Sequence, residues 1–245
     1  MSGPCVVFDV VGTCFGYDSV ADRLNDVLES QPALKDAAIQ PGLFFSAWTS
    51  NAEVDFQRLS VVKEFRSHSE LLKTAFYKTL QDAGVSESSV PEADVDMLIS
   101  EYSHNLTPRP GLAEMIQTLR DGGFTVWCCS DANPERVRGY FEKAGIDLPI
   151  ENLLSCDMCA AAKPDPKVYQ MVKKALGHAK VAVFAAAHSW DLAGARKEGF
   201  NTAYCTVCED QSSVDLFGEA DVVADTLPQL GSAVVQRWGE NSAQK

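Results

Sequence analysis

The sequence predicts an α/β protein in which a parallel β-sheet core is interrupted, close to its start, by a long helical insertion. Three observations lead to this fold class. A short apolar run near the start ends at an aspartate, the next ninety or so residues contain helical patterns without a convincing strand, and strand-like runs then alternate with amphipathic helical ones. Such alternation is typical of a parallel sheet with right-handed crossover connections.

The first predicted strand carries an acidic residue to one edge of the sheet. The apolar β-formers of Cys5–Phe8 end at Asp9, and Gly12 follows within three residues. Such a run predicts a buried parallel strand followed by a tight turn. Ligands of open α/β sheets bind at the carboxyl ends of the strands. Asp9 is therefore placed for chemistry, although by itself it could equally well cap the turn.

The stretch after this strand predicts a helical domain. Apolar residues recur at i, i+3 and i+4 spacing through Leu71–Leu80, and Gly84 is a plausible helix end. Further helices are expected over 20–28 and 93–102, whereas 32–41 is loop-like and 85–92 is polar and contains a proline. We therefore expect a helical domain over residues 15–106, inserted into a core made of residues 1–14 and 107–245.

Strands and helices alternate in the second part of the chain. A helix is expected to start at Asn133, because an Asn cap followed by proline favours a first turn, and Asp165-Pro166 carries the same kind of signal. Other helices are expected to follow Pro110-Gly111 and His188. The expected strands are 124–129, 150–154, 181–187, 202–207 and 220–223.

Charge and hydropathy restrict the partners. The formal net charge is −13, which disfavours nucleic acid and anionic membranes and favours a small-molecule partner. No apolar run approaches the roughly 20 residues needed to span a bilayer. The start lacks the basic segment and the long apolar run of a signal peptide. We expect a soluble, cytoplasmic protein.

The eight cysteines do not predict a disulfide framework, because the chain is long and carries no export signal. Two pairs, Cys156-x-x-Cys159 and Cys205-x-x-Cys208, have a spacing found in zinc sites. Each pair adjoins a predicted core strand and lacks a ligand-rich loop. Buried small residues and some free thiols are therefore the better interpretation.

Polar residues follow several of the predicted strands. Asp9, Ser130, Lys163, His188 and Asp191 all lie at or shortly after strand ends. Because the carboxyl ends of parallel strands meet at one edge of a sheet, these side chains are expected to form one site.

In order and spacing these motifs resemble the haloacid dehalogenase superfamily, and most closely its L-2-haloacid dehalogenase branch. The resemblance covers nearly the whole chain. It is carried by Phe8–Thr13, Asp18-Ser19-Val20, Lys163-Pro164-Asp165 with Val168-Tyr169, and Trp190–Arg196. It implies a Rossmann-like core, a helical cap domain over the site and, in many members, a homodimer.

The resemblance also implies roles for individual residues. Asp9 would attack the carbon beside a substrate carboxylate, displace halide and form an ester, which water then hydrolyses. Thr13, Ser130 and Lys163 would position Asp9 or bind the substrate carboxylate, and Asp191 would orient Lys163 or water. Tyr169 stands where the branch has its motif tyrosine, or is equally well a core residue of an amphipathic helix.

Phosphatases of the superfamily differ from this sequence in their metal-binding motifs. They carry a second aspartate two residues after the nucleophile, where this chain has Val11. The acidic pair of their fourth motif is replaced here by the run Ala186–Asp191. A magnesium phosphatase is therefore not expected, and we predict no metal and no cofactor.

Three positions also depart from the dehalogenases. The branch's halide-binding arginine would fall near residues 47–50, where only Trp48 stands out. The Ser and Asn that surround the hydrolytic water are replaced by Ala186 and His188. A departing halide needs a cradle of donors, because an unpaired buried charge is costly. His188 could serve as an acid or base near neutral pH, or be a hydrogen-bonded residue at a strand end.

These departures led us to expect chemistry on an epoxide. The leaving oxygen of an epoxide stays tethered and needs a proton more than a cationic cradle, and a carboxylic acid in an apolar pocket has a raised pKa and can supply it. The sequence also resembles fungal dehalogenase-like enzymes that rearrange epoxides in quinolone-alkaloid pathways. Phe45 and Trp48 would line a pocket for a bulky apolar substrate, unless they pack inside the cap.

Three functions therefore stand as hypotheses. The first is an epoxide-rearranging enzyme that uses Asp9 as Brønsted acid or nucleophile. The second is a hydrolytic 2-haloacid dehalogenase that forms an ester at Asp9. The third is a non-catalytic binding protein with this fold.

Overall fold

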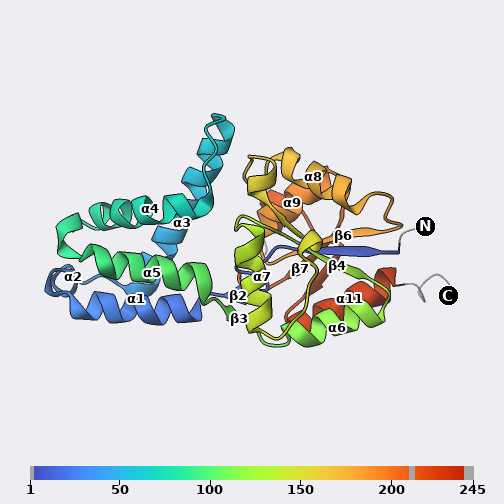
Figure 1. The fold of residues 1–245 in the computed structure, drawn as a ribbon, viewed down its shortest axis with the longest axis horizontal. Coiled ribbons are helices and arrows are strands. Elements are labelled where there is room, and N and C mark those ends of the chain that lie inside the picture. Colours follow the sequence, from blue (N-terminus) through green and yellow to red (C-terminus); the bar gives the residue numbers. More distant parts are fainter. Residues whose placement is uncertain (1–2, 210–212, 240–245) are drawn as a thin grey trace. The chain divides into compact units, whose positions relative to one another are not determined.

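The computed structural model describes residues 3–209 and 213–239. The chain divides into two compact units (Figure 1). One, the core unit, comprises Met1–Gly16 and Pro108–Lys245, and the other, the helical unit, comprises Tyr17–Thr107. The chain passes between them at β2 (Phe15–Gly16) and β3 (Thr107–Pro108), which pair as a two-stranded sheet.

The core unit contains a six-stranded parallel sheet with the strand order β5-β4-β1-β6-β7-β8. This confirms the predicted α/β fold class. The strands are β1 (Cys5–Phe8), β4 (Thr125–Ser130), β5 (Leu153–Ser155), β6 (Ala182–Ala186), β7 (Asn201–Cys205) and β8 (Val222–Ala224). The expected strand over 150–154 is shorter than predicted, because Ile150–Asn152 forms a 3₁₀ turn before it.

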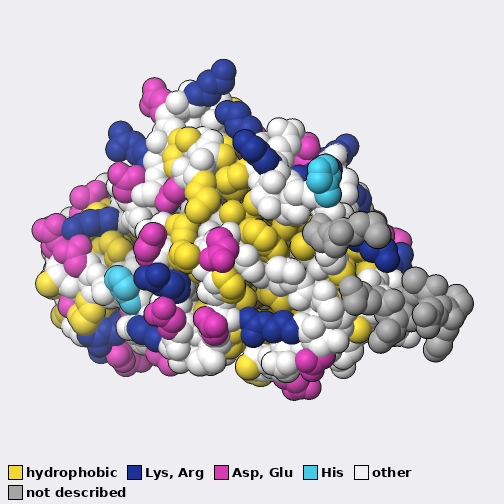
Figure 2. All heavy atoms as spheres, turned by 45° about the vertical axis from the view of Figure 1, so that its right-hand side comes forward, with side chains coloured by type: hydrophobic (Ala, Val, Ile, Leu, Met, Phe, Trp, Pro, Cys, Tyr) yellow, Lys and Arg dark blue, Asp and Glu magenta, His cyan; other side chains and the backbone are white. Residues whose placement is uncertain are grey.

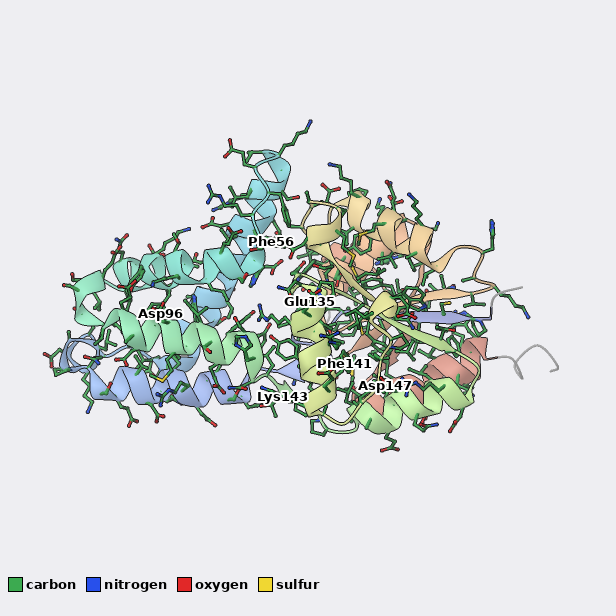
Figure 3. The ribbon with its side chains drawn as sticks, viewed as in Figure 1. Phe56, Asp96, Glu135, Phe141, Lys143 and Asp147 are labelled. Atoms are coloured by element: carbon green, nitrogen blue, oxygen red, sulfur yellow. The ribbon has the colours of Figure 1, made fainter. Side chains whose placement is uncertain are left out.

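Helices cover both faces of the sheet. Figure 1 shows α8 (Pro166–Leu176) and α9 (Ser189–Lys197) on one face and α6 (Leu112–Asp121) and α11 (Leu227–Trp238) on the other. The remaining helices of the unit are α7 (Pro134–Lys143), α10 (Val214–Phe217) and a 3₁₀ turn at Cys156–Met158. Phe141 of α7 packs edge-on against Phe15, with 5.0 Å between ring centroids (Figure 3).

The predicted helix caps are present. The side chain of Asn133 accepts a hydrogen bond from the Arg136 amide at 2.9 Å, and that of Asp165 accepts one from the Lys167 amide at 2.9 Å. Each cap is followed by proline at the first helical position. The sequence signals therefore fix where α7 and α8 begin.

Strand β1 lies at the centre of the sheet. It pairs in parallel with β4 on one side and β6 on the other, and Phe8 is in register with both Cys128 and Ala185. The chain moves outward from β1 through β4 to β5 and then returns to β6. The end of β1 is therefore a topological switch point, where an α/β sheet forms its ligand-binding crevice.

The helical unit contains five α-helices among its described residues. They are α1 (Asp18–Ser30), α2 (Pro32–Asp36), α3 (Pro41–Val61), α4 (His68–Asp82) and α5 (Glu92–His104), with a 3₁₀ turn at Glu87–Ser89. The prediction of a loop over 32–41 was wrong in its first half. Pro32 occupies the first turn of α2, where proline is tolerated because that turn needs no amide donor.

Aromatic side chains fill the interior of the helical unit. Trp48 of α3 is fully buried, lies edge-on to Phe76 with 5.3 Å between centroids, and donates its indole N–H to the Leu72 carbonyl at 2.8 Å. Phe45 is half-buried and packs against Tyr17 at 5.3 Å. Further along α3, Phe56 packs against Phe65 (Figure 3). Both residues predicted to line a substrate pocket, Phe45 and Trp48, thus make packing contacts within the helical unit.

Charged groups of both signs are distributed over the face drawn in Figure 2. Acidic residues outnumber basic ones, 34 to 21, in the whole sequence. Within the described residues, none of the helices combines the length and the apolar character that a membrane span requires.

Trp48 is expected to be a main source of stability in the helical unit. Removing a fully buried aromatic side chain leaves a cavity, so Trp48→Ala should lower the free energy of unfolding by about 3–5 kcal/mol. Leu43→Ala on the same helix is the control, because Leu43 is 72% exposed and should change stability by less than about 0.5 kcal/mol. Urea denaturation measures both. Equal effects would show that Trp48 does not hold the unit together.

Candidate active site

Asp9 stands directly after β1, at the switch point of the sheet. Its backbone N–H donates to the Ala185 carbonyl at 2.9 Å, which ties it to the end of β6. The residue is only 5% exposed, yet both carboxylate oxygens have partners. Oδ1 accepts from Lys163 Nζ at 2.6 Å, and Oδ2 accepts from Thr13 Oγ1 at 2.6 Å. An aspartate in this setting is held in one orientation.

Lys163 joins two carboxylates inside the core unit. Its ammonium group lies 2.6 Å from Asp9 Oδ1 and 2.9 Å from Asp191 Oδ2. All three side chains are nearly or completely buried. Lys163 comes from the segment between β5 and α8, and Asp191 from the first turn of α9. A buried ammonium group needs such partners, because an unpaired charge in the interior is costly.

Thr13 connects Asp9 to the neighbouring strand. Its hydroxyl donates to Asp9 Oδ2 and accepts from the Ala187 amide at 2.8 Å, just after β6. With both its donor and acceptor capacity used inside the protein, Thr13 acts on the orientation of Asp9.

Tyr169 lies behind Asp191. Its hydroxyl donates to Asp191 Oδ1 at 2.6 Å, and its ring packs on Phe184 with 5.5 Å between centroids. Gly194 of α9 makes room for this ring, since a Cβ at that position would lie 2.6 Å from the tyrosine hydroxyl. Tyr169 is therefore both a core residue and a hydrogen-bond donor to the site.

His188 forms the open side of the cluster. Its Nδ1 lies 3.3 Å from Asp9 Oδ2, its ring packs on Trp190 at 5.6 Å, and its side chain is 19% exposed. Gly12 lies against the same ring: a Cβ there would come within 2.6 Å of His188 Cε1, and the φ of +87° also favours glycine. The turn after β1 thus admits the imidazole beside Asp9.

The surroundings keep Asp9 ionised. Burial by itself would raise the pKa of Asp9, but the charge of Lys163 and the hydrogen bond from His188 outweigh it and hold the pKa below its ordinary value. Burial and the negative charge of Asp9 raise the pKa of Asp191, against the opposing effect of Lys163. The expected raised pKa of Asp9 was wrong, because Lys163 and His188 face its carboxylate in place of a purely apolar pocket.

The two cationic groups keep their protons. Burial opposes the charged form of Lys163, but Asp191 and Asp9 raise its pKa well above the ordinary value. Burial also opposes a charged His188, but its bonds to Asp9 and to Cys208 raise the pKa well above 6.5. The arrangement pairs an ionised carboxylate with neighbouring cations, which suits attack by that carboxylate on an electrophilic carbon.

Comparison with known proteins identifies the family of this chain. The family model described as haloacid dehalogenase-like hydrolase matches residues 4–199. The chain belongs to this family. The match runs from the start of β1 through the whole helical unit to just past α9, so it includes Asp9, Lys163 and Asp191 but not β7 and β8.

Several haloacid dehalogenases are similar to this chain. It is 34% identical to the (S)-2-haloacid dehalogenase 4A of Burkholderia cepacia over 108 residues, which span 44% of this chain and 46% of that enzyme. It is 23% identical to the (S)-2-haloacid dehalogenase of Pseudomonas sp. strain YL over 81% of each chain. The structure of L-2-haloacid dehalogenase from Xanthobacter autotrophicus superposes with a TM-score of 0.73 at 20% identity, covering 96% of this chain and 98% of that one.

Within the family, the relatives named above are 2-haloacid dehalogenases, so the chain is L-2-haloacid dehalogenase-like. They give no support to the further resemblance to fungal epoxide-rearranging enzymes. The structural match lies below 25% identity and speaks for the fold alone.

Not every predicted site residue joins the cluster around Asp9. Ser130 is buried at the end of β4, where its hydroxyl accepts from the Ala132 amide at 3.1 Å and shapes the turn. Phe45 and Trp48 belong to the helical unit, and their contact with substrate stays a prediction, as does the role of that unit as a cap.

Sequence reasoning missed Cys208, whose Sγ lies 3.6 Å from His188 Nε2. It was considered only as half of a cysteine pair, and the spacing of that pair gave no hint of an imidazole partner. Thr13, by contrast, could be assigned to the site from the sequence, because it follows Asp9 by only four residues in the same motif.

No cluster of three or more His, Cys, Asp or Glu side chains suited to a metal ion occurs within residues 3–209 and 213–239. All eight cysteines carry free thiols. Metal independence stays a prediction for the assay below.

Lys163 is expected to contribute more to stability than Asp9. Lys163→Met leaves two buried carboxylates without their shared cation and should cost about 3–5 kcal/mol. Asp9→Asn leaves Lys163 paired with Asp191 and should cost at most about 1–2 kcal/mol. Urea denaturation near neutral pH compares the two. If Asp9→Asn were the more destabilising, the stability of the cluster would not depend mainly on Lys163.

The pairing of His188 with Asp9 should weaken as the pH rises. Because the pKa of His188 lies above 6.5 in the folded chain, its stabilising effect is fully present below about pH 6.5 and is lost as the pH passes the folded-state value. We expect the unfolding free energies of the wild type and His188→Gln to differ most near pH 6, and the difference to shrink as the pH rises through the folded-state pKa of His188. A difference independent of pH would mean that His188 is neutral in the fold.

Proposed function

We propose that this haloacid dehalogenase-like protein hydrolyses a carbon–halogen bond in a small 2-haloacid, with Asp9 as the nucleophile. The observation that carries the proposal is the ionised state of Asp9, bound to Lys163 at 2.6 Å and flanked by Thr13 and His188. A carboxylate that acts as nucleophile must be deprotonated, and this environment favours that form. The similarity to the (S)-2-haloacid dehalogenases supports the same reaction.

In the first step an oxygen of Asp9 attacks the carbon that bears the halogen. A carbon–oxygen bond forms, the carbon–halogen bond breaks, and the halide leaves with the bonding electrons. The product is an ester of Asp9. Lys163 and Thr13 hold the carboxylate in a fixed orientation, which reduces the entropy lost on reaching the transition state.

In the second step water attacks the carbonyl carbon of the ester. The negative charge of Asp9 helps to keep His188 protonated. Ester formation removes that charge and so lowers the pKa of His188. His188 can then release its proton and take one from the attacking water. In this way His188 would take over the task of the Ser and Asn that hold the hydrolytic water in the dehalogenases, where this chain has Ala186 and His188.

Displacement at carbon sets a limit on the leaving-group site. The nucleophile and the leaving group lie on opposite sides of the reacting carbon, so side chains that flank Asp9 cannot also hold the departing halide. The cradle must therefore come from residues outside the Asp9–Lys163–Asp191 cluster.

Epoxide opening is the second candidate, and the raised pKa of His188 favours it. Here the imidazolium, rather than Asp9, would protonate the epoxide oxygen. The carbon–oxygen bond would break with its electrons on oxygen, and the resulting cation would rearrange within the molecule.

The decisive experiment incubates the full chain with 2-chloropropionate in ¹⁸O-labelled water with EDTA present. We expect free halide and, after several turnovers, ¹⁸O in the peptide that contains Asp9, since water attacks the carbonyl of the ester. Halide electrodes and peptide mass spectrometry measure the two. Asp9→Asn should lower the rate by more than about 10³-fold, and EDTA should leave it unchanged.

A parallel incubation with aryl epoxides separates the alternatives. An unlabelled isomer of the epoxide, formed without halide release from 2-chloropropionate, would overturn the hydrolytic proposal and favour acid catalysis by His188. Absence of product from both substrate classes would favour a binding protein.

A further inference from the structure

Three reactive groups follow one another at the edge of the site. Cys208 Sγ lies 3.6 Å from His188 Nε2, and His188 Nδ1 lies 3.3 Å from Asp9 Oδ2. The order thiol, imidazole, carboxylate is an arrangement in which an imidazole activates a neighbouring thiol while the carboxylate orients its ring. The hydrolytic reaction proposed above has no use for Cys208.

The position of Cys208 is held from several sides. The adjacent Glu209 carboxylate accepts from the Ser189 amide at 3.3 Å and from its hydroxyl at 3.1 Å. Tyr204 donates to the Glu209 carbonyl at 3.1 Å. These bonds tie the segment after β7 to the start of α9, where His188 is the N-cap residue.

The missing side chain of Gly12 opens the space for this contact. A Cβ there would lie 2.6 Å from His188 Cε1 and 3.5 Å from Cys208 Sγ. The thiol and the imidazole therefore meet over Gly12, in the turn that follows the nucleophile.

The other thiols of the chain have different surroundings. Cys5, Cys14, Cys128, Cys129, Cys156 and Cys205 are buried. Cys159 is half-buried like Cys208, but its thiol donates to the Cys156 carbonyl and burial raises its pKa. Cys159 thus provides an internal standard of similar exposure that lacks the imidazole contact of Cys208.

We propose that Cys208 is a second nucleophile of this site, a thiol activated by His188 that is alkylated by α-halocarbonyl compounds, and that its alkylation shuts down Asp9. The alkylation stands on the Cys208–His188 contact alone, whereas the loss of turnover rests on the function proposed above. The substrate class proposed for Asp9 contains the same electrophilic carbon, so both nucleophiles compete for one kind of compound.

The step balances without an oxidant or reductant. The protonated His188 donates Nδ1–H to Asp9 and Nε2–H to the sulfur, and the thiol proton passes to solvent. The sulfur attacks the carbon that bears the halogen, a carbon–sulfur bond forms, and the halide leaves with the bonding electrons. The resulting thioether has no proton to share with His188, and its added bulk lies in the space over Gly12 beside Asp9.

The test treats the full chain with iodoacetamide at neutral pH and follows the peptides of Cys208 and Cys159 by mass spectrometry. We expect Cys208 to react at least about 10-fold faster than Cys159, because the imidazole of His188 lies beside its sulfur and Cys159 lacks such a contact. His188→Gln should remove this advantage. The Cys159 rate in the same sample reports whether that variant is still folded, and an unchanged Cys159 rate makes the comparison valid.

Equal rates at the two cysteines, or a Cys208 rate that His188→Gln leaves unchanged, would overturn the proposal. The loss of halide release should follow Cys208 labelling in time, and Cys208→Ser should retain after treatment the activity that it had before. Selective labelling in a chain that never releases halide would confirm the activated thiol and refute the proposed function. Halide release without selective labelling would do the reverse.

Discussion

The buried ammonium group of Lys163 is the interaction on which the rest of the site depends. It lies within 2.9 Å of two carboxylates that would otherwise repel each other in the protein interior. Burying one such charge without partners costs several kcal/mol. Each of the three charged side chains can therefore be buried only because the others are present. Lys163 lies 154 residues after Asp9. The crossing from β5 back to β6, which creates the switch point, is what brings these distant residues together.

The sequence predicts the residues of this set better than their chemical state. Asp9 could be placed at a strand end because the apolar run before it is short and ends abruptly, and Lys163 and Asp191 could be placed near it because they follow later strands. The protonation of Asp9 could not be read in the same way, because it depends on donors from three other segments: Thr13, Lys163 and His188. An expected apolar pocket gave the wrong sign for the pKa shift.

Small residues were the other limit on prediction. Gly12 and Gly194 leave room for His188 and Tyr169 respectively, yet a glycine in a sequence does not show which side chain will occupy the space that it leaves. The loop prediction over 32–41 failed for a different, local reason, because Pro32 starts the short helix α2. The glycine case depends on tertiary neighbours, which no local pattern in the sequence shows.

The two oxygens of Asp9 are not equivalent, and this bears on the hydrolytic step. Oδ1 contacts the ammonium group of Lys163, whereas Oδ2 contacts the hydroxyl of Thr13 and the imidazole of His188. When water adds to an ester of Asp9, negative charge develops on the oxygen that is not alkylated. A full positive charge at 2.6 Å stabilises that oxyanion more than a neutral hydroxyl does. Attack through Oδ2 therefore leaves Oδ1 with Lys163 as the better arrangement, and it places the new ester oxygen beside His188, the group able to receive the proton of water.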